Sequence, residues 1–297
     1  MKILYLANFT DKPYKFTNEI KKELEQHHTV TAIDDSNFEM KEVVEKSKDC
    51  DMFLFHHGGI NTDSDLEFQM TLMRLKQLLE IIKCKKVLWF PEKVWMLSDQ
   101  IMEEIVPMVD SAYFNDDTWV RRHKYKNTHG LHFAAEESFK GEYREEYDLD
   151  VAFVGNPSAF RKPFIDNLRQ QFGNKFKVFT NVWDEDFADL CFSAKIIFVP
   201  NIPFDDFCWC NRIYNTLANG GFMVHPRFYG LGEQGFKDGV HYVGWKTWHD
   251  LLPTMKEYID LPKERKKIAK AGRDFVLKNH TYKERVKELC ELESQPQ

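Results

Sequence analysis

The sequence has few of the residues that mark disordered, fibrous or disulfide-stabilised proteins. It contains 14 glycines and 11 prolines among 297 residues, too few for a low-complexity chain. Its six cysteines include no Cys-x-x-Cys pair, and a chain of this length does not need disulfides to fold. Cys208 and Cys210 are the closest pair, without further residues at a metal-ligand spacing. We therefore expect an ordinary folded protein with free thiols and no metal site.

Long hydrophobic runs and an excess of positive charge are also missing. The 41 basic and 47 acidic residues give a net charge of -6, which does not draw the whole protein to nucleic acid or to anionic lipid. No apolar run reaches the roughly 20 residues that a membrane helix needs. The apolar run at residues 1–9 passes directly into polar residues rather than into a signal-peptide cleavage site. A cytoplasmic protein is expected.

Short apolar runs alternate with amphipathic segments in the first part of the chain. Strands are predicted at residues 2–9, 29–33, 51–55, 86–90 and 111–114, and helices at 17–27, 39–47, 65–83 and 98–106. Continuous apolar strands that alternate with helices predict a parallel sheet with right-handed crossovers.

The alternation lapses in the polar stretch 125–149 and then resumes, so we place a crossing between two domains there. Beyond it, strands are predicted at residues 150–155, 176–180, 196–199, 221–224 and 241–243, and helices at 162–172, 211–219, 261–279 and 282–292. The predicted fold class is α/β, with two tandem Rossmann-like, doubly wound domains at residues 1–135 and 150–280.

The stretch from Cys208 to Trp245 carries the clearest pattern. Its helix ends at two glycines, Gly220 and Gly221, where a left-handed cap is needed. The next strand ends at Pro226, and a loop with two glycines is predicted at residues 230–233.

Three charged residues of this stretch are expected to face one crevice, because ligands of open α/β sheets bind at the carboxyl ends of the strands. Arg212 begins the helix, and Arg227 and Glu233 follow the strand. Two other interpretations stay open: Arg212 could clamp the carboxylates of Asp205 and Asp206, and Glu233 could be a solvated loop residue.

The turn from Gly155 to Lys162 lies between a predicted strand and a predicted helix. A glycine lets a phosphate approach the backbone, and a helix N-terminus adds N–H groups and a favourable dipole. Arg161 and Lys162 add positive charge. Taken alone, the pattern fits an ordinary turn with surface cations better than a phosphate site, and both interpretations stay open.

In their order along the chain, these motifs resemble the donor-binding half of GT-B glycosyltransferases, above all the CgeB-like, spore-maturation-protein type. The likeness rests on the helix NRIYNTLANGG (residues 211–221), on GLGE (230–233) and on KDGVHY (237–242). Residues 154–161 are similar to the family's Val-Gly-x-x-x-x-Arg motif, with five residues in place of four between Gly155 and Arg161. Asn215 stands where the family usually has an acid. The resemblance covers residues 150–285, whereas the first half resembles these enzymes by topology only.

The resemblance implies a metal-independent, retaining hexosyl- or pentosyltransferase that moves a sugar from a nucleotide-diphosphate donor, UDP-sugar first of all, to an acceptor hydroxyl of a glycan, small molecule or protein. It implies no further cofactor. Residues 1–135 would form the acceptor side, residues 150–280 would bind the donor, and a helix at 281–297 would pack back on the first domain. The donor-binding residues it implies are Gly155, Asn156, Ser158, Arg161, Lys162, Lys195, Asn201, Arg212, Tyr214, Arg227, Gly230, Leu231, Gly232 and Glu233. Arg212 is also assigned to catalysis, while Lys195 is alternatively a charge that flanks a strand.

On the acceptor side, polar residues follow the predicted strands of the first domain. His57 is our choice of catalytic base, because a histidine exchanges protons near neutral pH and two glycines follow it. Topology adds Asn8, Thr10, Asp11, His56 and Glu92 to the acceptor side, and His129 and His132 near the crossing. In a retaining enzyme the donor phosphate would take the acceptor proton, whereas an inverting enzyme would need His57 or Asp11.

Two other functions fit the same sequence. One is a catalytically idle protein that binds a nucleotide on this fold. The other is a DNA-modifying glycosyltransferase that acts on hydroxylated bases and needs a basic surface, for which the sequence offers Lys12, Lys15, Arg121, Arg122, Lys124 and Lys126.

Overall fold

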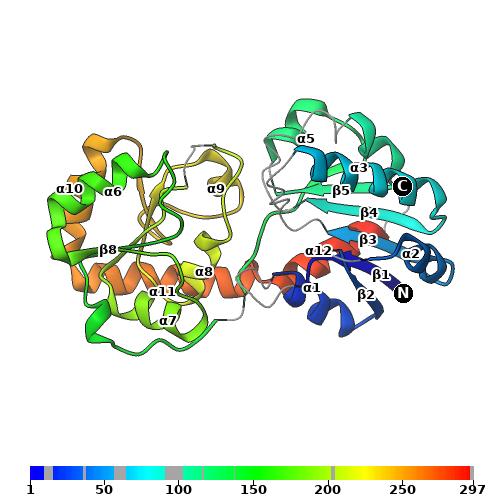
Figure 1. The fold of residues 1–297 in the computed structure, drawn as a ribbon. Coiled ribbons are helices and arrows are strands. Elements are labelled where there is room, and N and C mark those ends of the chain that lie inside the picture. Colours follow the sequence, from blue (N-terminus) through cyan, green and yellow to red (C-terminus); the bar gives the residue numbers. More distant parts are fainter. Residues whose placement is uncertain are drawn as a thin grey trace. The chain divides into compact units, whose positions relative to one another are not determined.

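The computed structural model describes residues 1–9, 16–35, 38–56, 65–90, 103–115, 117–136, 138–201 and 205–294, without the side chains of 65–72. The chain divides into two compact units, one of Met1–Phe133 with Tyr282–Gln297 and one of Ala134–Thr281 (Figure 1). Each unit has its own parallel sheet and its own core. The chain therefore passes between the units twice.

The first unit is built on a six-stranded sheet in the order β2-β1-β3-β4-β5-β6, with every described pairing parallel. Its strands are β1 (Lys2–Ala7), β2 (Thr29–Asp34), β3 (Met52–His56), β4 (Lys85–Phe90), β5 (Ser111–Phe114) and β6 (Thr128–Gly130). Its helices are α1 (Phe16–Glu25), α2 (Met40–Ser47), α3 (Asp65–Ile81), the 3-10 turn η1 (Val106–Met108), α5 (Asp117–His123) and α12 (Tyr282–Ser294).

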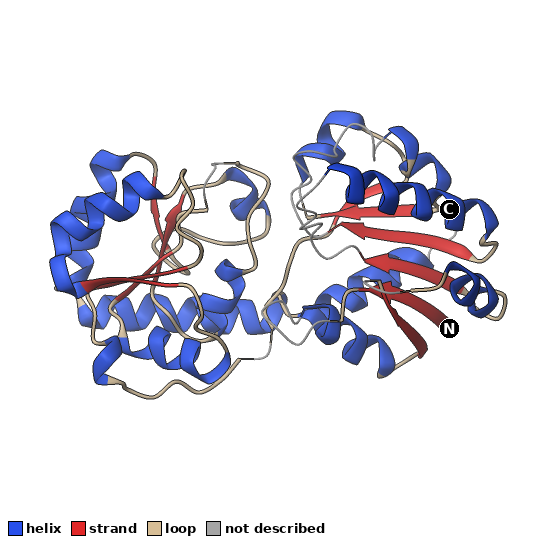
Figure 2. Ribbon diagram, viewed as in Figure 1, coloured by secondary structure: helices blue, strands red, loops and turns tan. Residues whose placement is uncertain are grey.

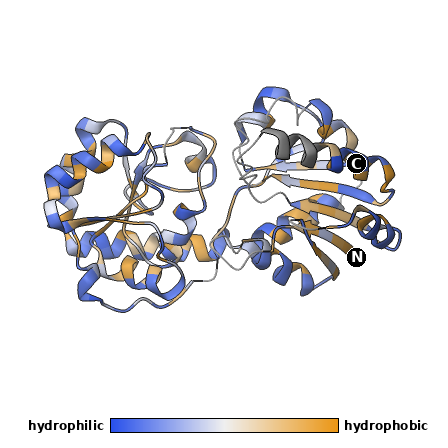
Figure 3. Cartoon of the chain, viewed as in Figure 1, coloured by the Kyte–Doolittle hydropathy of each residue, from blue (hydrophilic) through white to orange (hydrophobic). Residues whose placement is uncertain are grey.

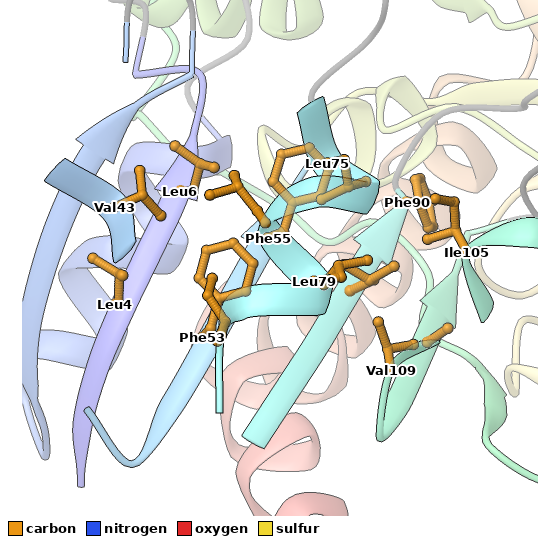
Figure 4. Close-up of a cluster of buried hydrophobic side chains, with 14 of the residues drawn as sticks. Leu4, Leu6, Val43, Phe53, Phe55, Leu75, Leu79, Phe90, Ile105 and Val109 are labelled. Carbon is orange, nitrogen blue, oxygen red and sulfur yellow. The ribbon is translucent and has the colours of Figure 1, made fainter. Parts of the chain in front are cut away.

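The chain reverses direction at β1, because β2 lies on one side of it and β3 on the other. Right-handed crossovers then place α1 on one face of the sheet and α2 and α3 on the opposite face. Apolar side chains of β1 and β3 pack against α2 and α3 in a core that includes Leu6, Phe55, Val43 and Leu79 (Figure 4). A topological switch point thus lies between β1 and β3.

The last helix, α12, packs beside α1 in the first unit. Its Glu293 is buried and is held by two groups of the sheet. The Lys85 ammonium lies 2.7 Å from one carboxylate oxygen, and the Tyr113 hydroxyl donates to the other. Helix α12 is therefore part of the first unit, although the sequence between α12 and the rest of that unit forms the second unit.

The second unit is built on a five-stranded sheet in the order β11-β10-β9-β7-β8, again with every described pairing parallel. Its strands are β7 (Val151–Val154), β8 (Phe176–Phe179), β9 (Ile196–Phe198), β10 (Met223–Pro226) and β11 (Val243–Trp245). Its helices are α6 (Lys162–Phe172), α7 (Asp184–Ser193), α8 (Arg212–Ala218), α9 (Tyr229–Glu233), α10 (Trp248–Ile259) and α11 (Pro262–Asn279), with 3-10 turns η2 (Glu145–Tyr147) and η3 (Gly173–Lys175).

In this sheet the strand order reverses at β7, because β8 lies on one side of β7 and β9 on the other. A second topological switch point therefore lies between β7 and β9. Helices α6 and α10 lie on one side of this sheet and α7 and α8 on the other (Figures 1 and 2). Buried residues of α6 and α10 such as Ile165 and Met255 pack on Phe153 and Phe198. The strands of both units are mainly hydrophobic, and the outward faces of the helices mainly hydrophilic (Figure 3).

Helix α8 ends as its glycines predict. Gly220 has a φ of 76°, in the region that favours glycine. Its N–H donates to the carbonyl of Leu217 and the N–H of Gly221 to that of Thr216, both at 2.9 Å. This is the Schellman pattern, and it turns the chain sharply into β10.

The predicted fold class is confirmed, but several elements differ from the prediction. Helices α5, α7 and α10 and the short strand β6 were not predicted, and β10 and β11 each begin two residues later than expected. The helix predicted at 98–106 falls largely outside the described residues. In the described part of the chain no helix has both the length and the apolar character that a membrane span requires.

Candidate active site

The candidate site lies at the carboxyl edge of the second sheet, beside its switch point. Gly155 directly follows β7, and residues 199–201 follow β9. The chain leaves these neighbouring strands in opposite directions, and open α/β sheets bind ligands in the crevice expected at the carboxyl ends of such strands. The structure brings the turn 155–162 and the start of α8 to this crevice.

Gly155 and Arg212 touch each other there. Gly155 has a φ of 144°, and a Cβ atom on it would lie 2.9 Å from Nη2 of Arg212. Its N–H donates to the carbonyl of Phe179 at 2.7 Å, which fixes the turn to β8. Only glycine gives the Arg212 guanidinium this close approach to the backbone.

Two guanidinium groups share the ring of Phe153. The Cζ atom of Arg212 lies 6.0 Å and that of Arg161 5.9 Å from the ring centroid. Arg161 also donates to the carbonyl of Asn156 at 2.9 Å. Two positive charges are therefore held together beside the switch point, a natural place for an anion.

Arg212 is half-buried, and no carboxylate of the described residues pairs with its guanidinium. The alternative role, a clamp on Asp205 and Asp206, does not occur in the structure. These carboxylates instead accept backbone N–H groups, from Phe207 at 3.0 Å and from Tyr229 at 3.2 Å. A cation that is partly removed from water without a counter-ion can pair with an anionic ligand.

The rest of the turn 155–162 is a compact entry into α6. The carbonyl of Ser158 accepts the N–H groups of Arg161 and Lys162 at 2.9 and 3.0 Å. Lys162 is exposed and forms an ion pair with Asp166 one turn along the helix. The side chain of Asn156 is exposed at the open side of the turn.

Asn201 positions the segment that leads to α8. Its backbone has a φ of 42°, unusual for a residue other than glycine. Its side-chain oxygen accepts the N–H of Cys210, and its side-chain nitrogen donates to the carbonyl of Cys208, both at 3.0 Å. Because both ends of the amide are occupied, Asn201 shapes the approach to Arg212 rather than offering a free group.

The glycines at 230–233 lie in a short helix, α9, and the prediction of a loop was wrong. A Cβ on Gly230 would lie 2.6 Å from the carbonyl oxygen of Asp206, to which the Gly230 N–H donates at 2.9 Å. Leu231 is fully buried, whereas Gly232 and Glu233 are exposed. Packing and this hydrogen bond outweigh the low helix propensity of two glycines.

Three other donor candidates occupy different surroundings. Lys195 precedes β9 and pairs with Asp150 at 2.7 Å, so it lies at the amino edge of the sheet and not at the site. Tyr214 is fully buried, and its hydroxyl accepts the indole N–H of Trp209 at 2.8 Å, so it is a core residue. Arg227 lies at the carboxyl edge, where its Nε is 2.6 Å from a carboxylate oxygen of Asp238.

His225, at the same edge, was not among the sequence candidates. It is fully buried, and burial lowers the pKa of its ring to about 3. Its Nδ1 lies 2.6 Å from the carbonyl oxygen of Pro226 and donates to it. The ring therefore stays neutral at physiological pH and belongs to the core beneath the site.

In the first unit, the structure describes two of the acceptor-side candidates. His56 is fully buried, stacks on Trp89 with ring centroids 4.9 Å apart, and shares a 2.9 Å hydrogen bond with Tyr5. It is a core residue, and its assignment to the acceptor side was wrong. Asn8 is half-buried at the end of β1, beside the switch point of this sheet. The other acceptor-side candidates lie outside the described residues: Thr10, Asp11, His57 and Glu92.

A histidine–carboxylate pair marks the ends of β5 and β6. Nε2 of the buried His132 lies 3.4 Å from a carboxylate oxygen of Asp117, and Nδ1 lies 3.0 Å from the carbonyl oxygen of Asn115. His129 stacks on Tyr113 with ring centroids 5.2 Å apart. Asp117 was overlooked, although its position just after a strand was a signal.

Within the described residues, no group of three or more His, Cys, Asp or Glu side chains is arranged to hold a metal ion. All six cysteines are free thiols.

The two Rossmann-like units in tandem give the fold of GT-B glycosyltransferases. Three solved structures are similar over the whole chain. HepE from Anabaena, crystallised with UDP and glucose, is 14% identical with a TM-score of 0.66, and 99% of each chain is covered. An alpha-glucosyltransferase with UDP-glucose and DNA containing an abasic site is 12% identical with a TM-score of 0.64 and the same coverage. An alpha-glucosyltransferase with UDP is 10% identical with a TM-score of 0.67, covering 99% of this chain and 100% of its own.

A family described as "Glycosyl transferase-like" matches residues 161–291, which include α6, α8, α9 and Arg212. No curated protein matches the chain significantly. The family match thus covers less than half of the chain, namely most of its second unit and most of α12, while the fold over the whole chain is that of GT-B glycosyltransferases.

Proposed function

We propose that this glycosyltransferase transfers a hexose from a UDP-sugar to an acceptor hydroxyl with retention of configuration, and that it belongs to the CgeB-like type. The complexes of HepE with UDP, glucose and UDP-glucose support the choice of donor. The order of motifs between Gly155 and Tyr242 supports the subfamily.

One observation carries the proposal: Arg212 is half-buried against Gly155 and Phe153 at the switch point, and no described carboxylate neutralises it. A diphosphate would supply the missing negative charge. Gly155 has no side chain that would block the approach of that phosphate to the backbone, and Arg161 adds a second guanidinium. We place the donor diphosphate here, with Asn156, Ser158 and Lys162 lining the turn and Arg227 and Glu233 on the far side.

These cations fit the charge that the reaction creates. The bond between the anomeric carbon and the β-phosphate oxygen breaks, and the electron pair stays on the phosphate. Arg212 and Arg161 would stabilise the departing UDP more strongly than the intact donor, because UDP carries more negative charge than the UDP-sugar.

The acceptor loses a proton as its oxygen forms the new bond to the anomeric carbon. In a retaining reaction the leaving phosphate oxygen lies on the attacked face and takes this proton, so a protein base is not required. His57 or Asp11 would serve as the base of an inverting enzyme. We propose Asn8, Thr10, Asp11, His57 and Glu92 for the acceptor side because they follow strands β1, β3 and β4.

The test is a thermal-shift screen with UDP, GDP and ADP and with a panel of UDP-sugars, followed by a UDP-release assay. Ligands that bind only the folded state raise the melting temperature. We expect UDP and one UDP-hexose to stabilise the protein and that UDP-hexose to be hydrolysed slowly without acceptor. Stabilisation without any UDP release, with or without a broad acceptor panel, would favour the idle nucleotide-binding protein instead.

DNA is a second candidate acceptor, because a basic surface surrounds the C-terminal end of α5. Arg122, Lys124 and Lys126 are exposed and have no ion pair within the described ranges, and Arg122 lies over the Trp119 ring at 5.6 Å. One structural neighbour was crystallised with DNA. If DNA is the acceptor, affinity for a short duplex should fall steeply with salt, and replacing the three cations by glutamine should reduce that slope. A salt-independent or undetectable affinity would exclude it.

A further inference from the structure

Three asparagines, the N-cap Asn211, Asn215 inside α8 and the C-cap Asn219, all contact the segment at which the second unit begins. The side-chain oxygen of Asn215 accepts the N–H of Glu136 at 3.0 Å, and that of Asn219 accepts the N–H of Phe139 at 2.9 Å. The Asn211 amide donates to the Glu136 carboxylate at 3.3 Å. A spacing of four residues places the three side chains on one stripe of the helix.

This segment is also paired with the second crossing between the units. The N–H of Ala135 donates to the carbonyl of His280 at 2.8 Å, and Ala135 forms a β-bridge with Thr281. The His280 ring in turn contacts the ring of Tyr214 on α8, and its Nε2 lies 3.1 Å from the carbonyl oxygen of Gln234, the C-cap of α9. Residues at both crossings are thus attached to the helices that border the candidate site.

Arg212 is the neighbour of Asn211 on the same helix, and Asn215 lies less than one turn from it. The guanidinium reaches Gly155 and Phe153 on one side while the asparagine stripe holds residues 135–139 on another. A seven-residue helix is too short to bend between these contacts, so a displacement at one of them must displace the other.

The amide at 215 suits this contact better than the acid that is usual in the CgeB-like type. The Glu136 carboxylate already accepts a hydrogen bond from Asn211 beside it. A carboxylate at position 215 would place a second negative charge near the Glu136 carboxylate in partly buried surroundings, and the two would repel each other. The Asn215 amide is neutral and still accepts the N–H of Glu136. The departure from the family pattern at Asn215 thus has a physical reason.

We propose that Asn215 is a positioning residue for Arg212: through it, the paired crossing segments 135–136 and 280–281 set the place of the cation that meets the donor diphosphate. The proposal rests on the proposed function for the role of Arg212. It assigns to Asn215 no contact with the substrate.

The experiment compares Asn215→Leu with Asn219→Leu. Each variant removes one amide that accepts a backbone N–H of the crossing segment, but position 219 lies one turn further from Arg212. We expect similar falls in melting temperature. UDP affinity by calorimetry should fall about tenfold or more for Asn215→Leu and stay within about twofold of wild type for Asn219→Leu. A purely structural role predicts equal effects of both variants on UDP affinity, and that result would overturn the proposal.

Asn215→Asp combined with Glu136→Gln provides the conservative rescue, because it retains an acceptor oxygen at 215 and removes the like charge. It should restore UDP affinity to within about threefold of wild type, and affinity as low as that of Asn215→Leu would contradict the proposed contact.

A measurement without ligand separates failure of this proposal from failure of the proposed function. The side-chain Nε–H signals of Arg212 and Arg161 should both sense the Phe153 ring, because both guanidinium groups lie against it. In Asn215→Leu the NMR signal of Arg212 should shift while that of Arg161 stays. If Arg212 does not shift, the positioning role is wrong. If it shifts in a protein that never binds UDP, the positioning stands and the donor assignment fails.

Discussion

Replacing Gly155 by alanine should impair donor binding beyond its effect on folding. The residue has a φ of 144°, and the added Cβ would lie 2.9 Å from Nη2 of Arg212 and 3.2 Å from the Phe153 ring. Holding alanine in a sparsely populated backbone conformation costs on the order of 1–3 kcal/mol of stability. The contact with Arg212 must also relax by several tenths of an ångström, and the guanidinium is the mobile partner.

Gly173 offers a matched control within the same unit. Its φ is 54°, so alanine is strained there as well, but no heavy atom lies within 4 Å of the Cβ that would be added. Gly173→Ala should therefore lose on the order of 1–3 kcal/mol of stability through the backbone alone. It follows α6 and precedes β8, at the amino edge of the sheet and away from the candidate site.

The assay pairs chemical denaturation with UDP titration for both variants. We expect both to lose stability, and only Gly155→Ala to lose UDP affinity, by about 1.4 kcal/mol or more, a factor of ten. Equal UDP affinities of Gly155→Ala and wild type would refute the placement of the diphosphate against Gly155 and Arg212. A similar loss in Gly173→Ala would show that the affinity merely follows stability.

Three further predictions address single residues. Arg212→Ala should weaken UDP binding by roughly 1.5–3 kcal/mol, the worth of hydrogen bonds to a charged group, and calorimetry that finds wild-type affinity would remove Arg212 from the site. Burial lowers the pKa of His225 to about 3, whereas the unfolded chain binds a proton below about 6.5. Stability should therefore fall by about 1.4 kcal/mol per pH unit on acidification from about 6.5 toward 3; His225→Gln should flatten that slope in urea denaturation, and an unchanged slope would assign it to other groups. If His57 is the base, His57→Ala should slow transfer much more than it weakens donor binding, and a rate within about threefold of wild type, under roughly 0.7 kcal/mol of barrier, would show it to be a bystander.

The fold could be predicted from sequence wherever strands are continuously apolar. The apolar runs at residues 3–7 and 151–154 are buried on both faces of their sheets, and such a pattern clearly indicates a strand. Helix α10 was missed because Pro253 lies inside it, and α9 because two of its five residues are glycine. In both segments, packing against the rest of the unit stabilises a helix although the residues themselves have a low helix propensity.

Single residues of the candidate site could be predicted where they have a recognisable position relative to a strand or a helix. Gly155 and Arg212 stand out because a glycine after a strand and a cation at a helix start have local signatures. The contact between them spans 57 positions and has no local signature in the sequence, because it depends on which strands become neighbours. The prediction for Lys195 failed for the same reason, because its partner Asp150 lies 45 positions earlier. The prediction for Tyr214 failed because its side chain is fully buried in the core.

The spacing of the three asparagines on α8 was visible in the sequence, but their partner was not. Glu136 and Phe139 lie about 80 residues earlier in a polar stretch without regular pattern. Nothing in that stretch indicates that its backbone N–H groups face a helix. A crossing segment takes its conformation from the surface on which it lies, so only the structure shows the contact.

We propose above that the second unit binds a nucleotide diphosphate against Gly155, Arg161 and Arg212. The most direct test is a crystal structure of the chain with UDP. Density for the diphosphate within hydrogen-bonding distance of the Arg212 guanidinium and beside the turn 155–162 is the predicted result. Density for UDP solely in the first unit, with Arg212 unoccupied, would contradict it.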